Sequence, residues 1–266
     1  MSAPKIAILT DFGDYDPFVG IMRGVMSRIA PQAKHISITQ QIPPGDIQRA
    51  AVVLWQSVPH FPPGTIFLVV VDPGVGTERR AIIFKSGKKV FIGPDNGVFS
   101  YILDQKTKVW ELSNPDFQYT ELSSTFHGRD IFSPAAAYAS LGIQPSQFGD
   151  PVQDQVKLPT PDLDFDGNSL RGEVLTADHF GNLLTSLGKF SPIKEGTFHF
   201  DPWIGALSPR DMVLNNPQIT LADGTTLPLI STFGDLTGRE CGVLVGSTGL
   251  LELVANQHAA AEILKL

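Results

Sequence analysis

IFLVVVDPGVGTERR, residues 66–80, is the stretch that decides the fold of this chain. It begins with six consecutive apolar residues, several of them β-branched, which is typical of a strand buried on both faces of a parallel sheet. Asp72 ends the run, and ligands bind beyond the carboxyl ends of strands in open α/β sheets. The glycine-bearing loop that follows can return Arg79 toward Asp72, as part of a site or as a simple surface ion pair.

The pattern on either side of this stretch predicts two domains. Residues 1–155 alternate strands and helices, which indicates an N-terminal α/β domain with a mainly parallel central sheet. Residues 156–168 contain two prolines and several acids, which is typical of a linker. Residues 169–266 hold short strands separated by turns, so we expect a smaller all-β, barrel-like C-terminal domain. Helices are expected at 18–29, 47–57, 98–103 and 131–141.

Composition narrows the classes of partner. The 266 residues carry a net charge of −7, which argues against nucleic acid or an anionic membrane, because both require a surplus of Lys and Arg. The single cysteine, Cys241, excludes an intrachain disulfide framework and a cysteine-rich metal site. No apolar signal segment or stretch long enough to span a bilayer is present, so we expect a cytoplasmic protein.

Acidic residues gather near the expected loop tips of the first domain, at Asp11, Asp16, Asp72 and Asp95. Such acids serve as metal ligands for phosphoester hydrolysis or as acceptors for the vicinal hydroxyls of a ribose. The metal interpretation is weakened because no HxxxH or HExxH spacing is present. Helix capping and turn chemistry is the preferred interpretation for Asp14, Asp46 and Asp95.

Three further segments have polar residues in positions suited to a ligand. His127 precedes a glycine at a loop-to-helix junction and titrates near neutrality, which favours an acid–base role over a structural one. In DHFGN at 178–182, Phe180 and Asn182 suit the binding of a flat base, with a plain β-turn as the alternative. The turn GSTG at 246–249 offers backbone groups and the Ser247 hydroxyl to a carboxylate.

Six motifs occur in order along nearly the whole chain. They are TDFG…D at 10–16, DPGVGTERR at 72–80, PDNG at 94–97, TFHGRD at 125–130, DHFGN at 178–182 and GSTGLLELVANQ at 246–257. Together they resemble the S-adenosyl-L-methionine hydrolase (adenosine-forming) family, also called SAM hydroxide adenosyltransferases, which is related to fluorinase and chlorinase. The resemblance implies a homotrimer whose ligand lies between the N-terminal domain of one subunit and the C-terminal domain of a neighbour.

The resemblance also implies a reaction and a set of site residues. S-adenosyl-L-methionine is hydrolysed to adenosine and L-methionine without a metal or another cofactor, and Asp72, Arg79 and His127 form the water-activating triad. Asp11 holds the ribose hydroxyls and Asp16 the methionine amino group. The remaining substrate-binding residues are Gly128, Asp178, Phe180, Asn182, Ser247, Glu252, Ala255 and Gln257, with the residues at 180 and 182 flanking the adenine and those at 178 and 247 near the amino-acid end.

Departures from the related halogenases favour water over halide. Those enzymes carry Tyr at the positions of Asp72 and His127 and Ser at that of Gly128, and they have an extra loop where residues 85–89 are short here. The carboxylate of Asp72 would repel a halide. Thr248 stands where the fluorinase has Arg. Halogenase-like activity, a metal-dependent phosphoesterase and a non-catalytic adenosine or S-adenosyl-L-methionine binder are the alternatives, and the choice of base between Asp72 and His127 stays open.

Overall fold

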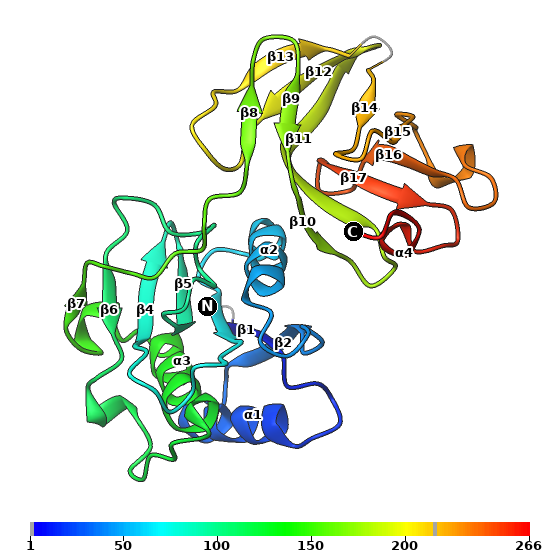
Figure 1. The fold of residues 1–266 in the computed structure, drawn as a ribbon. Helices are drawn as coiled ribbons and strands as arrows, with labels where there is room; N and C mark the ends of the chain where they lie inside the picture. Colours follow the sequence, from blue (N-terminus) through cyan, green and yellow to red (C-terminus); the bar gives the residue numbers. More distant parts are fainter. Residues whose placement is uncertain (1–2, 215–216) are drawn as a thin grey trace. The chain divides into compact units, whose positions relative to one another are not determined.

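The structure, a computed structural model, describes residues 3–214 and 217–266 (Figure 1). The chain divides into two compact units, Met1–Leu158 and Pro159–Leu266, which we call the N-terminal unit and the C-terminal unit. The predicted two-domain organisation is confirmed. Among the residues described, no helix is long and apolar enough to cross a membrane.

In the described part of the N-terminal unit, seven strands form one sheet in the order β2-β1-β3-β5-β4-β6-β7. They are β1 (Lys5–Thr10), β2 (Lys34–Thr39), β3 (Ile66–Val70), β4 (Ala81–Ser86), β5 (Lys89–Pro94), β6 (Val109–Glu111) and β7 (Pro151–Val152). The pairs β1–β2, β1–β3 and β3–β5 are parallel, whereas β4–β5, β4–β6 and β6–β7 are antiparallel. The sheet is therefore mixed rather than mainly parallel. The tight turn at 87–88 explains the difference, because a parallel pair requires a much longer crossover connection.

Alternate residues of the central strands enter two separate cores, one on each face of this sheet. Ile8 of β1 packs in the core that contains α1 (Phe18–Ile29) and α3 (Ser133–Ser140), whereas Leu9 packs in the core that contains α2 (Ile47–Ser57) (Figure 1). Leu68 and Val69 of β3 alternate in the same way. Successive side chains of a strand point to opposite faces, so strands apolar at every position are buried on both. Their carboxyl ends are thereby rigidly held.

Helix starts follow local sequence. Asp46 caps α2 as predicted, because its carboxylate accepts a hydrogen bond from the Arg49 N–H at 2.8 Å, a contact that stabilises a helix by about 1 kcal/mol. Of residues 98–103, predicted to be helical, residues 98–102 form consecutive turns instead. Their backbone bonds reach three residues back, as from the Ser100 N–H to the Gly97 carbonyl at 3.0 Å, which is typical of turns. The helix predicted at 131–141 begins earlier, as the π-helix η3 (Gly128–Phe132), and continues as α3.

Within the residues described for the C-terminal unit, the main sheet follows the path β13-β12-β11-β17-β16, with β10 paired to β11, and its pairs are antiparallel. Its strands are β10 (Val174–Ala177), β11 (Leu183–Lys194), β12 (Thr197–Asp201), β13 (Arg210–Val213), β16 (Cys241–Val245) and β17 (Leu250–Ala255). Smaller pairs join β8 (Leu163–Phe165) to β9 (Leu170–Gly172) and β14 (Ile219–Thr220) to β15 (Thr226–Leu227), and α4 (Ala260–Leu264) ends the chain. The unit is rich in strands, and its closure into a barrel stays a prediction.

Candidate active site

Two acids leave neighbouring strand ends of the N-terminal unit. β1 and β3 are parallel, with Thr10 opposite Val70, so Asp11 and Asp72 emerge at the same edge of the sheet. Asp11 accepts a hydrogen bond from the Gly45 N–H at 2.8 Å. Burial raises the pKa of Asp11, the Gly45 N–H opposes this, and the nearby charge of Asp72 adds to the rise. The charge of Asp72 therefore acts on the carboxylate of Asp11.

Arg79 joins Asp72 to His127. Its Nε donates to Asp72 Oδ1 at 2.8 Å, and one of its terminal NH2 groups donates to Asp72 Oδ2. The same NH2 nitrogen lies 2.9 Å from His127 Nδ1. The side chains of Arg79 and Asp72 are only 10% and 4% exposed, and the guanidinium carbon lies 5.2 Å from the centre of the Phe132 ring. The planar fork of arginine fixes this arrangement in a way that a lysine does not.

The contact with Arg79 fixes the tautomer of His127. A guanidinium group only donates, so Nδ1 must accept, and the neutral ring carries its proton on Nε2. Burial lowers the pKa of His127 and the charge of Arg79 lowers it further, while the carboxylates of Asp72 and Asp130 oppose the shift. His127 is therefore neutral near pH 7 and presents an N–H donor at Nε2.

The loop that carries His127 is tied down by Asp130. Asp130 is fully buried, and its carboxylate accepts hydrogen bonds from the Ser123 N–H at 2.8 Å and from Arg129 Nε at 2.5 Å. The guanidinium carbon of Arg129 also lies 5.4 Å from the centre of the Phe126 ring. His127 occupies the N-cap position of η3, and π-helical turns occur often at functional sites. Asp130 thus binds a residue that precedes His127 in the chain and a residue that follows it, which fixes the backbone that carries His127.

Gly128, which the family resemblance implies as a substrate-binding residue, is buried. A Cβ added here would lie 3.2 Å from Met22 Sδ and 3.2 Å from the Phe126 ring, and the Gly128 carbonyl accepts the Ser133 hydroxyl at 2.7 Å. The structure gives this glycine a packing role. Contact between Gly128 and a ligand stays a prediction.

The other acids of this unit fall into two groups. Asp14 accepts a hydrogen bond from Gln41 Nε2 at 2.8 Å and Asp95 forms an ion pair with Arg80, which agrees with their interpretation as structural residues. Asp16 is exposed and makes no hydrogen bond to another described residue, so its carboxylate is open to a ligand. Among residues 3–214 and 217–266, no group of three or more His, Cys, Asp or Glu side chains is arranged to hold a metal ion.

The C-terminal unit contributes a second group of candidate residues. Two adjoining hollows of about 480 and 470 Å³ share Phe180, Asn182 and Phe233 in their walls. The Phe180 side chain is 74% exposed, whereas Asn182 is buried. Asp178 orders this loop, because its carboxylate accepts the N–H groups of Phe180 at 2.8 Å and of Asn182 at 2.9 Å. An exposed ring on a fixed loop is suited to stack on a flat ligand.

The remaining predicted residues of this unit also line the two hollows. Ala255 and Gln257 line the first, and Asp178, Ser247 and Glu252 line the second. Burial raises the pKa of Glu252, and the charge of Asp178 adds to the rise. Gln257 adopts φ 57°, an uncommon conformation for a residue with a side chain, and such strain clusters at ligand-binding sites.

Sequence reasoning missed Phe233. This ring is 41% exposed and lies in the wall of both hollows beside Phe180. Asp235 holds its turn by accepting the N–H groups of Ser231 at 2.9 Å and Thr232 at 3.0 Å. The signal that could have revealed it is the run TFGD at 232–235, which repeats the aromatic–glycine–polar order of HFGN at 179–182.

Comparison with known proteins relates this geometry to a family. The SAM hydroxide adenosyltransferase N-terminal domain matches residues 6–149, and the C-terminal domain of the same family matches residues 172–266. The chain belongs to the SAM hydroxide adenosyltransferase family. The N-terminal match contains Asp11, Asp72, Arg79 and His127, and the C-terminal match contains all residues of the two hollows.

Relatives align along nearly the full length of this chain. A protein of Salinispora arenicola (strain CNS-205), named (R)-S-adenosyl-L-methionine hydrolase, is 44% identical over 99% of this chain and 94% of its own. A protein of the same name from Salinispora tropica is 37% identical over 98% of this chain and 94% of its own. An uncharacterized conserved protein of Thermotoga maritima has a similar crystal structure, with a TM-score of 0.82 and 31% identity over 98% of this chain and 96% of its own.

Proposed function

We propose that this chain hydrolyses S-adenosyl-L-methionine (AdoMet) to adenosine and L-methionine by in-line attack of water on C5′. The observation that carries the proposal is the cluster in which Arg79 bridges Asp72 and His127 at the carboxyl edge of the sheet. Two relatives that align with almost the whole chain bear the name of this activity.

AdoMet makes few chemical demands on its hydrolase. The sulfonium departs as a neutral thioether, so the leaving group needs no protonation, and the proposal includes neither a metal nor another cofactor. The requirement is a water held about 3–3.5 Å from C5′ on the side opposite sulfur. As the new O–C5′ bond forms, the electron pair of the C5′–S bond passes to sulfur, and the water loses one proton.

The directions of the hydrogen bonds favour Asp72 as the acceptor of the proton. Nδ1 of His127 is occupied by Arg79 and Nε2 already carries a proton, so the ring can orient a water but cannot accept its proton. The Asp72 carboxylate keeps lone pairs beyond the two that Arg79 uses. The guanidinium of Arg79 stabilises the negative charge that develops on the water oxygen. We therefore assign Asp72 as the base and His127 as the orienting donor.

The two groups of binding residues divide the substrate between them. In the N-terminal unit, Asp11 accepts the ribose hydroxyls and the open carboxylate of Asp16 accepts the methionine ammonium. In the C-terminal unit, the rings of Phe180 and Phe233 bracket the adenine.

Other residues of the C-terminal unit complete the contacts. The backbone at Ala255 and Gln257 and the amide of Asn182 read the adenine edge. Asp178, Ser247 and Glu252 lie at the amino-acid end, where the Thr248 hydroxyl is buried without a hydrogen-bond partner among the residues described. We place each site between the N-terminal unit of one subunit and the C-terminal unit of its neighbour in a cytoplasmic homotrimer. The division of the binding residues between two units supports this arrangement.

Single substitutions test the proposed triad. Asp72→Ala, Arg79→Ala and His127→Ala should each lower adenosine formation from AdoMet by about 100-fold or more, because each removes the proton acceptor, the stabilising charge or the orienting donor. Product chromatography measures the effect. Asp14→Ala is the control. It removes an acid whose hydrogen-bond partner is Gln41, and it should retain activity. Wild-type rates in all three variants would refute the triad.

The same assay separates the alternatives. Loss of activity in EDTA would indicate a metal-dependent phosphoesterase, and AdoMet recovered unchanged after hours would indicate a binding protein. Formation of 5′-halo-adenosine in chloride or fluoride would indicate a halogenase. We expect adenosine in each condition, because the carboxylate of Asp72 repels a halide and the proposed step uses no metal.

A further inference from the structure

The loop that carries Asp72 and Arg79 passes over the end of β5. β3 and β4 are consecutive in the chain, yet β5 lies between them in the sheet. β5 is parallel to β3 and antiparallel to β4, so its end lies next to both the end of β3 and the start of β4. The turn that follows β5, residues 95–97, is therefore adjacent to both ends of the loop.

Asn96 in this turn holds the end of the loop that precedes Asp72. Its Nδ2 donates to the Val71 carbonyl at 2.9 Å, and its Oδ1 accepts the Val98 N–H at 3.2 Å. The second contact keeps the amide in place so that the first is maintained. The backbone position from which Asp72 departs is thus set by a side chain of the turn that follows β5.

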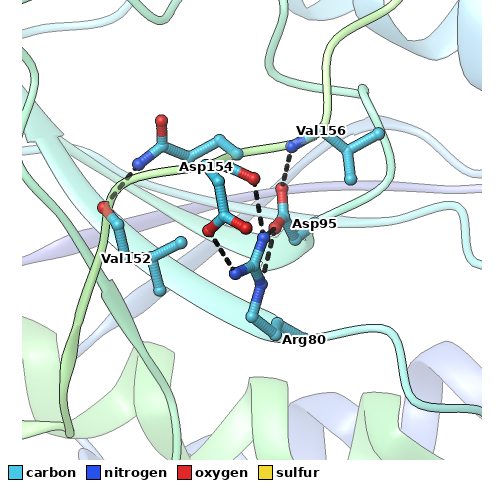
Figure 2. Close-up of polar contacts among 6 residues, drawn as sticks. Arg80, Asp95, Val152, Asp154 and Val156 are labelled. Atoms are coloured by element: carbon cyan, nitrogen blue, oxygen red, sulfur yellow. Dashed lines mark hydrogen bonds and ion pairs between the residues drawn. The ribbon is translucent and has the colours of Figure 1, made fainter.

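Asp95 holds the other end of the loop, which follows Arg79. Its N–H donates to the Arg80 carbonyl at 2.9 Å, and its buried carboxylate accepts Arg80 Nε at 3.0 Å and an Arg80 NH2 group at 2.7 Å. The other carboxylate oxygen accepts the Val156 N–H at 2.9 Å. Figure 2 shows Arg80 reaching Asp95 on one side and Asp154 on the other. Both the backbone and the side chain of Arg80 are therefore fixed by Asp95.

Glycines on each side of this pair allow the close approach. A Cβ at Gly93 would lie 2.3 Å from the Val69 carbonyl oxygen, so only glycine lets the end of β5 lie this close to β3. Gly97 has φ +99°, a conformation that residues with side chains rarely adopt. The run GPDNG is thus built to bring Asp95 and Asn96 against the loop rather than only to reverse the chain.

We infer that Asp95 and Asn96 are positioning residues for the catalytic pair: Asn96 fixes the backbone before Asp72, and Asp95 fixes the backbone after Arg79. One turn then sets the separation between the carboxylate that takes the proton and the guanidinium that stabilises the new charge. The inference rests on the proposed function. A displacement of about 1 Å in this geometry costs up to about 100-fold in rate. A variant of Asp95 or Asn96 leaves the substrate-binding residues unchanged. Its loss of rate should therefore appear in kcat and not in KM.

Asn114 provides a matched control for Asn96. Its Nδ2 donates to the Gln147 carbonyl at 2.9 Å and its Oδ1 accepts the Asp116 N–H at 3.1 Å, so it makes the same two kinds of bond elsewhere in the same unit. Asn96→Ala should lower kcat by about 10- to 100-fold with KM for AdoMet changed less than about twofold. Asn114→Ala should leave both constants unchanged while lowering the melting temperature similarly. Equal kcat in the two variants, or a loss confined to KM, overturns the inference.

A second pair of variants covers the case in which Asn96→Ala does not fold. Asp95→Asn keeps an acceptor for the Val156 N–H but removes the charge that holds Arg80, and kcat should fall. Asp154→Asn removes the charge of the outer partner of Arg80. Because the Asp154 side chain is 83% exposed, kcat should be unchanged. Equal kcat in these two variants overturns the inference.

An NMR titration of His127 gives a readout that does not depend on turnover. When Arg79 is no longer held in place, its charge lowers the pKa of His127 less, so the pKa should rise in Asp95→Asn and not in Asp154→Asn. An unchanged His127 pKa in Asp95→Asn overturns the inference even if wild-type protein releases no adenosine. Wild-type protein that releases no adenosine would instead overturn the proposed function.

Discussion

At the scale of single residues, Arg79 fixes the tautomer of His127 and lowers its pKa. Its guanidinium forms two bonds to Asp72 and approaches Nδ1 of His127 with a third donor. A cation in this place favours the neutral form of the imidazole. His127 is therefore kept neutral, with an N–H at Nε2 that can orient a water.

Removing Arg79 should therefore change the titration of His127. In Arg79→Ala the pKa of His127 should rise, because the repelling cation is lost while the carboxylates of Asp72 and Asp130 remain. NMR of the imidazole resonances measures the shift. A second arginine–histidine pair provides the control: burial lowers the pKa of His35, and the charge of Arg23 lowers it further. Arg23→Ala should raise the pKa of His35 and leave that of His127 unchanged.

The rate of the wild-type enzyme should follow the same titration. Protonation of His127 would place an N–H against the guanidinium of Arg79, so activity should be lost as the pH falls through the lowered pKa. The midpoint should therefore lie below 6.5, the ordinary value for histidine. An acid limb centred above 6.5, or a His127 pKa that falls in Arg79→Ala, would contradict this account of the cluster.

At the scale of elements, the central strands of the sheet were predicted correctly from the sequence. The apolar runs of β1 and β3 predicted strands buried on both faces, and the acids that follow them lie together at one edge. The direction of the outer strands was less accessible. β6 and β7 have only three and two residues, and a run of a few apolar residues has the same pattern in a parallel and an antiparallel pair. Only the tight turn at 87–88 indicated a hairpin.

The parts of the candidate site that the sequence did not predict depend on contacts between distant segments. Asp95 and Asn96 are turn residues by composition, and only the placement of β5 between β3 and β4 gives them a role at the loop. The tautomer of His127 follows from a bond to a residue far away in the chain. Phe233 was not predicted because an exposed aromatic residue beside a glycine does not by itself indicate a site. It becomes a candidate because it lines the same two hollows as Phe180.

At the scale of the whole molecule, the proposed site residues are divided between two units and, we propose, between two subunits. The triad belongs to the N-terminal unit, and the two aromatic rings belong to the C-terminal unit. If each site forms between neighbouring subunits, a variant that is inactive in one unit can complement a variant that is inactive in the other.

Mixed oligomers test this arrangement. Arg79→Ala and Phe180→Ala, each of low activity alone, should together recover about one quarter of wild-type activity when co-expressed in equal amounts. Random mixing pairs two intact halves at about one interface in four of a ring with head-to-tail contacts. Co-expression of Arg79→Ala with Asp72→Ala, which damages the same unit twice, is the control. Activity no greater than the mean of the single variants, in mixed oligomers shown to form, would contradict an intersubunit site.

We propose that water attacks C5′ of AdoMet, and the fate of the water oxygen tests this step. The reaction is run in water enriched in ¹⁸O, and both products are analysed by mass spectrometry. We predict one ¹⁸O atom in the 5′-hydroxyl group of adenosine and none in L-methionine, because the C5′–S bond breaks as the O–C5′ bond forms. Unlabelled adenosine, or label in the methionine product, would contradict the account.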